Sequence, residues 1–123
     1  MKKLLFGAML VVLPVTALHA MTVATFLQKA EALEKRGATA LFSSDLRLLK
    51  REVEGATKSL KEERLAAERA GRRGAYCPPQ QGGSMNSREL LDHFRAIPAP
   101  QRERTEVKDA MRSLLARKFP CPA

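Results

Sequence analysis

Two cysteines, Cys77 and Cys121, are the side chains of this sequence with the widest chemical scope. A thiol acts as a nucleophile when a histidine activates it, and His93 is the one histidine beyond residue 20. A structural zinc site would need four ligands, more than these three residues supply. The cysteines also lack the Cys-x-x-Cys spacing of a redox-active pair. What the thiols do therefore depends on the compartment in which the protein folds.

The other polar clusters do not indicate a catalytic site. Asp92 adjoins His93, but neighbouring residues of a helix point to different sides, so a serine triad built on this pair is not expected. Gly82-Gly83-Ser84 is too short for a phosphate-binding loop and lacks the lysine of a P-loop. The sequence therefore predicts a protein that is not an enzyme and that holds no cofactor and no metal.

The first twenty residues predict the compartment. Lys2 and Lys3 form a short basic head, and the stretch 4–18 that follows carries no charge. Small residues then offer cleavage sites after Ala20, which is favoured, or after Ala17. This is the layout of a secretory signal peptide, and the uncharged stretch is shorter than the roughly 20 residues that a membrane-spanning helix needs. We expect a cleaved signal peptide over 1–20, with an uncleaved anchor as the alternative, and a periplasmic or secreted protein.

Export changes the prediction for the two cysteines. Thiols of exported proteins are commonly oxidised in pairs, so Cys77 and Cys121 are expected to form a disulfide and neither is expected to act as a nucleophile. In the chain-entropy description, closing a loop of this length stabilises the folded state by roughly 4 kcal/mol. That is a large share of the net stability of a small domain.

Charge and aromatic content restrict the partners. Of 22 Lys and Arg residues, two lie in the first twenty, which leaves 20 against 13 Asp and Glu and a net charge of +7. Aromatic side chains are few and Trp is absent, which argues against a surface that stacks nucleic-acid bases. The charge suits an acidic protein partner in the periplasm or an anionic envelope surface, or it marks a solvated surface without a specific role. The sequence predicts no oligomeric state.

Apolar spacing predicts the two helices of the N-terminal half. Thr22 is expected to cap the first helix and Gly37 to end it. The apolar residues of this helix are Val23, Phe26, Leu27, Ala30 and Leu33. After a short turn with Phe42, Ser43-Ser44-Asp45 predicts the start of the longest helix, which runs to about residue 70. Its apolar stripe is Leu46, Leu49, Val53, Ala56, Leu60 and Ala67.

The long helix carries a dense charged face opposite this stripe. Burial is expected to weaken at Glu63, where the stripe is interrupted, and Glu62 and Glu63 are expected to form ion pairs within a solvated face. A coiled-coil seam is the alternative. Arg69, Arg72 and Arg73 form a basic cluster at the end of the helix. We interpret them either as a charged C-terminal cap or as an electrostatic contact for a partner.

A linker and a helical hairpin are predicted beyond residue 70. Residues 71–83 contain Pro78-Pro79 and Gly82-Gly83, which favour a linker, and Cys77 lies within it. Asn86 and Glu89 have the spacing of a capping box, which marks the start of the next helix.

Prolines delimit the two helices of this hairpin. Pro98 and Pro100 are expected to end the first, and the second is predicted over Glu103 to Lys118, with Thr105 as a candidate later cap. Their apolar faces are Leu90, Leu91, Phe94 and Ile97, and Val107, Met111, Leu114, Leu115 and Phe119. The connection 97–100 is longer than the turn of a helix–turn–helix motif, which together with export argues against DNA binding.

The predicted fold is all-α. It is a small bundle of about four helices, with one long charged helix and a C-terminal hairpin closed by a disulfide. The expected organisation is a signal peptide over 1–20 and one domain over 21–123, divided into N-terminal helices (21–70), a linker (71–83) and the hairpin (84–123).

Parts of this pattern resemble known exported proteins. The segments that carry the main resemblance are Cys77-Pro78, Glu89-Leu90-Leu91, Phe94, Pro98, Met111, Leu114-Leu115 and Phe119-Pro120-Cys121. Over residues 77–123 the chain resembles the C-terminal half of the immunity proteins for type VI secretion amidase effectors. The resemblance implies a small, helical, disulfide-bonded protein that binds and blocks a peptidoglycan amidase in the periplasm.

The N-terminal half departs from that family, since it lacks a second cysteine pair and has the long helix 45–70. The whole chain, with Leu41-Phe42-Ser43-Ser44-Asp45-Leu46 and Ala75-Tyr76-Cys77-Pro78-Pro79, is similar to uncharacterised small exported proteins of alphaproteobacteria.

Two functional hypotheses follow. The first is an exported, non-enzymatic binding protein of immunity or inhibitor type that occludes a periplasmic partner, for which a rigid helical scaffold loses little ordering entropy. The alternative is an envelope-associated structural protein whose basic long helix contacts anionic lipid or polysaccharide.

Overall fold

The computed structural model describes residues 20–123, so the predicted signal peptide, including the cleavage site after Ala17, lies outside the described residues except for the exposed Ala20. The elements are α1 (Val23–Arg36), the 3-10 helix η1 (Gly37–Phe42), α2 (Ser44–Arg69), α3 (Ser87–Ala96), α4 (Ala99–Arg102) and α5 (Val107–Lys118). Apart from one isolated bridge, residues 20–123 contain no β-structure. The all-α prediction is confirmed.

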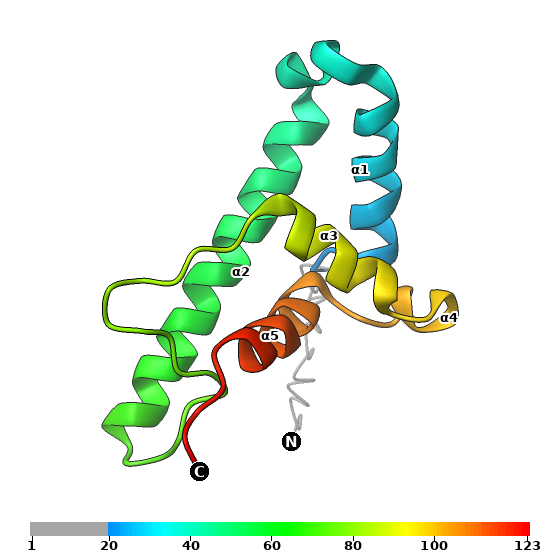
Figure 1. Cartoon of the computed structure of the whole chain (residues 1–123). Helices are drawn as coiled ribbons and strands as arrows, with labels where there is room; N and C mark the ends of the chain where they lie inside the picture. The colour runs from blue at the N-terminus through cyan, green and yellow to red at the C-terminus, as the bar shows by residue number, and fades with distance from the viewer. Residues whose placement is uncertain (1–19) are drawn as a thin grey trace, which may run out of the picture.

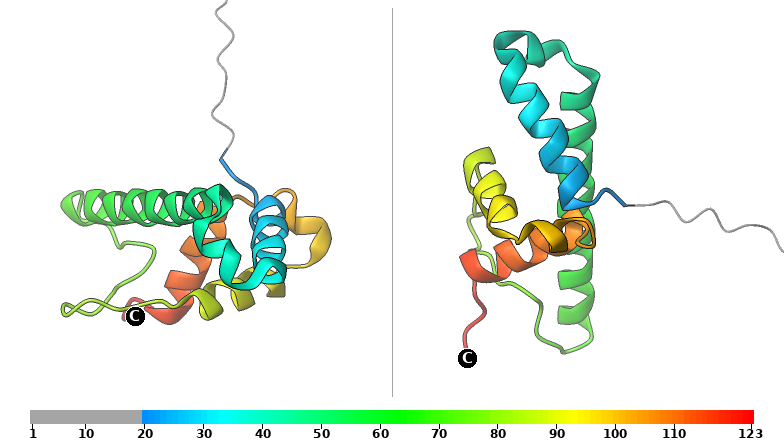
Figure 2. Two further views of the ribbon diagram at one scale, coloured as in Figure 1. Left: turned by 90° about the horizontal axis from the view of Figure 1, so that it is seen from above. Right: turned by 90° about the vertical axis from the view of Figure 1, so that its right-hand side faces the viewer.

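Two helical hairpins form the fold (Figure 1). Helices α1 and α2 diverge from η1 at one end of the molecule, and α5 packs across α2. Helix α3 packs against both α1 and α5, and both views of Figure 2 show α3 and α5 on the same side of α2. Among the described helices, none is long and apolar enough to cross a membrane.

The helix starts follow the local signals in the sequence. The side chain of Thr22 accepts a hydrogen bond from the backbone N–H of Thr25, and that of Ser43 accepts from Asp45. Asn86 and Glu89 form both hydrogen bonds of a capping box. Gly37 ends α1 with a φ of 61°, a conformation that favours glycine.

The core is one cluster to which both hairpins contribute. All five predicted apolar residues of α1 are buried, whereas α2 buries only Leu49, Ala56 and Leu60. The largest side chains with almost no exposed surface are Phe94, Leu60, Met111, Val23 and Val107. The rings of Phe26 and Phe94 meet edge to face, with centroids 5.2 Å apart, and join α1 to α3.

The start of the last helix differs from the prediction. The backbone turns once as α4 and becomes extended, and α5 begins only at Val107. The extended segment pairs with the residues before α1, since the N–H of Val23 donates to the carbonyl oxygen of Thr105 at 2.8 Å. The hydroxyl of Thr105 donates to the carbonyl of Gln101 and does not cap α5. Tertiary pairing therefore overrides the helical pattern of residues 103–106.

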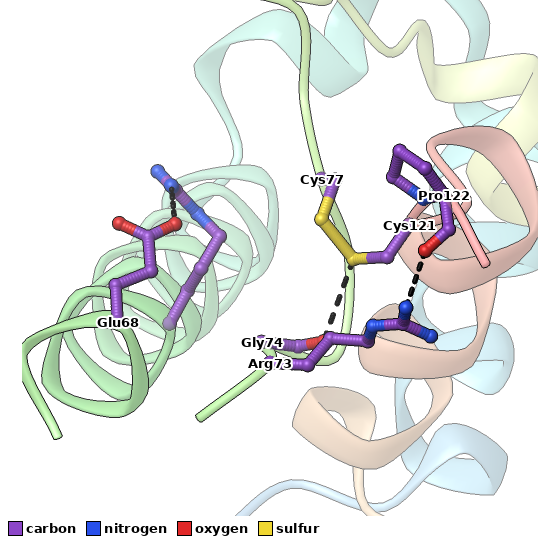
Figure 3. Close-up of a disulfide and its surroundings, with 7 residues drawn as sticks. Glu68, Arg73, Gly74, Cys77, Cys121 and Pro122 are labelled. Atoms are coloured by element: carbon purple, nitrogen blue, oxygen red, sulfur yellow. Dashed lines mark hydrogen bonds and ion pairs between the residues drawn. A yellow bond between two sulfur atoms is a disulfide. The ribbon is translucent and has the colours of Figure 1, made fainter. Parts of the chain in front are cut away.

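The linker 71–83 is non-helical, as predicted, and it is anchored at several points. Cys77 and Cys121 form a disulfide with a Cα–Cα distance of 4.8 Å (Figure 3). The N–H of Cys77 donates to the carbonyl oxygen of Phe119 at 2.8 Å. The ring of Tyr76 is buried, with the guanidinium of Arg64 5.5 Å from its centroid. The linker therefore forms one wall of the fold.

Candidate binding groove

The disulfide occupies both thiols, so neither cysteine is available as a nucleophile. Its surroundings tie the linker to the C-terminal segment, because the side chain of Arg73 donates to the carbonyl oxygen of Pro122 (Figure 3). Together these contacts hold the end of α5 beside the end of α2.

His93 lies between α3 and α5. Its Nε2 is 2.9 Å from Oγ of Ser113, and Ser113 donates its own proton to the carbonyl oxygen of Ala110 at 2.8 Å. The serine is therefore the acceptor and Nε2 the donor, which is the reverse of what an activated serine needs. Burial, assisted by the nearby Arg117, lowers the pKa of His93 below its usual 6.5. Its Nδ1 is buried without a hydrogen-bond partner.

The carboxylates that the sequence singled out lie on the surface. Asp92 and Glu62 are exposed, and Glu63 forms ion pairs with Lys108 and with Arg112 across the α2–α5 contact. Hydrogen bonds from those two side chains lower the pKa of Glu63. Within residues 20–123, no three His, Cys, Asp or Glu side chains gather in a way that could hold a metal ion.

The basic cluster at the end of α2 is exposed. Arg69 lies in the last helical turn, where a cation interacts favourably with the helix dipole. The backbone N–H of Arg72 donates to the carbonyl oxygen of Ala67 and closes the helix end. Arg73 reaches the C-terminal segment, as described above. The structure thus places all three arginines beside the disulfide (Figure 3).

An apolar groove of about 860 Å³ lies between α1, α2, α3 and the segment 83–87. Buried core residues form its floor, and partly exposed apolar residues surround them. The floor contains Phe26, Leu49, Leu90, Met111 and Leu115, and the surrounding residues include Leu41, Leu46, Val53, Met85 and Leu91. Glu34, Lys50 and Glu54 are the charged residues of its lining.

Two ion pairs between helices connect the walls of this groove. Lys29 of α1 contacts Asp45 at the start of α2, with Nζ and Oδ1 3.2 Å apart. Arg95 of α3 contacts Glu34 of α1 at 3.0 Å. Surface pairs of this kind contribute little stability individually, but they fix α1 relative to both neighbours. A wide apolar groove with few polar groups is typical of a binding site.

The groove continues into an exposed apolar tip on η1. Leu41 lines the groove although it is 72% exposed, and its neighbour Phe42 is 86% exposed. Large apolar side chains next to one another at this exposure are typical of an interaction site. Leu48 on α2 is also exposed, at 40%, but it does not line the groove. We call Leu41 and Phe42 the apolar tip.

Sequence reasoning missed both the groove and the tip. The segment between the first two helices was predicted as a short turn, and the structure makes it a 3-10 helix without buried residues. The available signal was Leu41-Phe42, an apolar pair that continues neither helical stripe.

Comparisons of the chain with protein-family models, with curated proteins and with solved structures found no match. The resemblance of the C-terminal half to amidase immunity proteins therefore stays a prediction.

Proposed function

We propose that this protein is an exported, non-enzymatic binding protein that seats an apolar segment of a periplasmic protein in the groove. The observation that carries the proposal is the continuity of the groove with the exposed tip at Leu41 and Phe42. Together they offer a partner both an apolar concavity and two projecting side chains. Large apolar side chains with this access are the usual anchors of protein interfaces.

The proposed compartment rests on two features of different kind. The signal-peptide layout of residues 1–20 favours export, and the Cys77–Cys121 disulfide suits an oxidising compartment. The disulfide also restricts the linker, so the protein loses little conformational entropy when a partner docks.

The chemistry of the partner follows from charge. With a net charge of +7 beyond residue 20, the protein attracts a partner with an acidic surface, and electrostatic attraction raises the association rate. The resemblance to amidase immunity proteins makes a peptidoglycan amidase the first partner class to test. In that role the protein would occlude the amidase.

The test is affinity capture from a periplasmic extract of the source bacterium, with residues 21–123 as bait. The variant Leu41→Ser/Phe42→Ser removes the apolar tip, and Leu48→Ser is a matched control for loss of an exposed apolar side chain away from the groove. We expect one stoichiometric partner, bound at least tenfold more weakly by the tip variant once purified, since burying one such side chain contributes about 1.5–3 kcal/mol.

Two results would contradict this proposal. One is unchanged binding by the tip variant, and the other is equal weakening by Leu48→Ser. The immunity role has its own test, which is inhibition of an amidase encoded beside the gene. Without inhibition that role is lost, whereas the capture experiment still decides the binding proposal.

The alternative, envelope association through the long helix, finds little support in the charge of α2. This helix carries seven Lys and Arg residues and six Asp and Glu residues, so its net charge is +1. The basic residues are Arg47, Lys50, Arg51, Lys58, Lys61, Arg64 and Arg69, and the acidic residues are Asp45, Glu52, Glu54, Glu62, Glu63 and Glu68. A nearly balanced face attracts an anionic surface weakly.

A further inference from the structure

The end of the molecule that contains the disulfide carries most of the excess positive charge. Residues 69–84 and 117–123 contain five Lys and Arg residues and no Asp or Glu. The disulfide joins these two segments, which we call the basic end. The five basic residues are Arg69, Arg72, Arg73, Arg117 and Lys118. They account for five of the seven net positive charges beyond residue 20.

Four of these cations are accessible. Arg69, Arg72, Arg73 and Arg117 are exposed, whereas Lys118 is engaged by Glu89 at 2.8 Å. Glu68, the acidic residue next to this end in the sequence, contacts Arg64 at 3.0 Å and leaves the charge of the four arginines uncompensated by its own (Figure 3).

The basic end is held in place by covalent and hydrogen bonds. Besides the disulfide, the N–H of Cys77 donates to Phe119 and the side chain of Arg73 donates to Pro122. Gly83 lies so close to the ring of Phe119 that a Cβ at this position would come within 2.1 Å of it. The arginines therefore project from a fixed platform.

The surface chemistry of this end favours phosphate groups. Large apolar side chains are exposed at Leu41, Phe42 and Leu48, and none of these lies in the basic end. A protein partner would thus find no apolar anchor there, although protein interfaces usually have one at their centre. Arginine binds phosphate oxygens with two parallel hydrogen bonds, and all four exposed cations are arginines.

We propose that the basic end docks on the phosphate headgroups of an anionic phospholipid membrane. This docking is separate from the groove. Helix α2 has 26 residues and is therefore about 39 Å long, with η1 before its first turn and Arg69 in its last. The protein would rest on the membrane by its basic end and present the apolar tip away from it (Figure 1).

The test is co-sedimentation of residues 21–123 with vesicles. One set of vesicles contains phosphatidylglycerol and the other consists of phosphatidylcholine alone. Wild type is expected to bind the first set only, and to be released as ionic strength rises. The variant Arg69→Gln/Arg72→Gln/Arg73→Gln is expected to bind about 100-fold more weakly, given the usual contribution of each basic residue near an anionic surface.

A second variant removes the same charge elsewhere. Arg47→Gln/Arg51→Gln/Lys58→Gln changes three exposed cations of α2, and we expect only a small loss of binding from it. Equal losses in the two variants would overturn the assignment to the basic end, as would binding to phosphatidylcholine or no binding at all. Circular dichroism of each variant checks that the fold is intact.

Two further arms separate other sources of the same signal. Inorganic phosphate, added at constant ionic strength, is not expected to displace the protein from vesicles, and full displacement would indicate a site for free phosphate. The tip variant Leu41→Ser/Phe42→Ser is expected to bind vesicles as wild type does. If it does not, the membrane contact involves the apolar tip and the proposal fails independently of the groove function.

Discussion

The backbone N–H of Val107 donates a hydrogen bond of 2.9 Å to the carbonyl oxygen of Met21. Met21 directly follows the favoured cleavage site, and Val107 is the first residue of α5. A second bond, from Val23 to Thr105, completes an antiparallel bridge around Thr22 and Glu106. The residues just after the predicted signal peptide therefore connect the start of α1 to the start of α5.

Truncation tests this connection. A protein of residues 21–123 is expected to be as stable as one of residues 20–123, because both keep the carbonyl of Met21. A protein of residues 23–123 loses this acceptor and the cap at Thr22, and its free energy of unfolding should fall by about 2 kcal/mol. Urea denaturation followed by circular dichroism measures the difference. Equal stability of all three proteins would show that the bridge contributes nothing.

The bridge also shows why the sequence predicted one helix start wrongly. Residues 103–106 fit a helical pattern, and their extended conformation depends on partners more than eighty residues earlier in the chain. Local signals were sufficient where the capping interactions are local, as at Thr22, Ser43 and Asn86. Long-range pairing leaves no such mark in the sequence.

Removal of the disulfide is expected to destabilise the protein strongly. The bond spans a sequence separation of 44 residues, and in the chain-entropy description its loss costs roughly 4 kcal/mol. The variants Cys77→Ser and Cys121→Ser should show similar losses in urea denaturation, as should wild type in reductant. Because reductant acts on wild type through the same bond, the Cys77→Ser variant should be insensitive to it. A loss below about 1 kcal/mol in every case would contradict the structural role of the bond.

Tyr76 gives a test of the linker as part of the core. Its ring is 6% exposed and lies beneath the guanidinium of Arg64. The change Tyr76→Ala should reduce the free energy of unfolding by about 3 kcal/mol, as expected for loss of a buried aromatic side chain. Pro79→Ala, at an exposed position of the same linker, is the control and should have little effect. A loose linker would instead make the two variants equally mild.

The burial of Tyr76 and the groove were both beyond the reach of sequence patterns, for a common reason. Helical periodicity identified the inward faces of α1, α3 and α5 because each face recurs along one element. Tyr76 is a single aromatic residue in a stretch rich in Gly and Pro and has no periodic partner. The groove depends on how far α1 and α2 diverge, which is set by packing between elements.

His93 predicts how stability depends on pH. Its folded-state pKa lies below 6.5, so the unfolded chain binds a proton at a higher pH than the folded protein does. Stability is therefore full above pH 6.5 and falls as the pH decreases through the lowered pKa. His93 is the one histidine beyond residue 20, so His93→Gln should abolish this dependence between pH 6.5 and 4.5.

Below pH 4.5 a second loss is expected in both proteins. The pKa values of Glu63 and Glu89 are lowered by hydrogen bonds from basic side chains, so stability present above pH 4.5 is lost as these groups are protonated. Thermal unfolding over this range separates the two effects. A wild-type profile that is flat from pH 6.5 to 4.5 would contradict the assigned environment of His93.

The most direct measurement of the binding proposal is site-specific photo-crosslinking in the periplasm. A photoreactive residue in place of Phe42 reports on the apolar tip, and one in place of Leu48 reports on an exposed apolar position outside the groove. The proposal predicts one strong adduct with a periplasmic protein from position 42 and little or none from position 48. Equal adducts from both positions, or none from position 42, would contradict it.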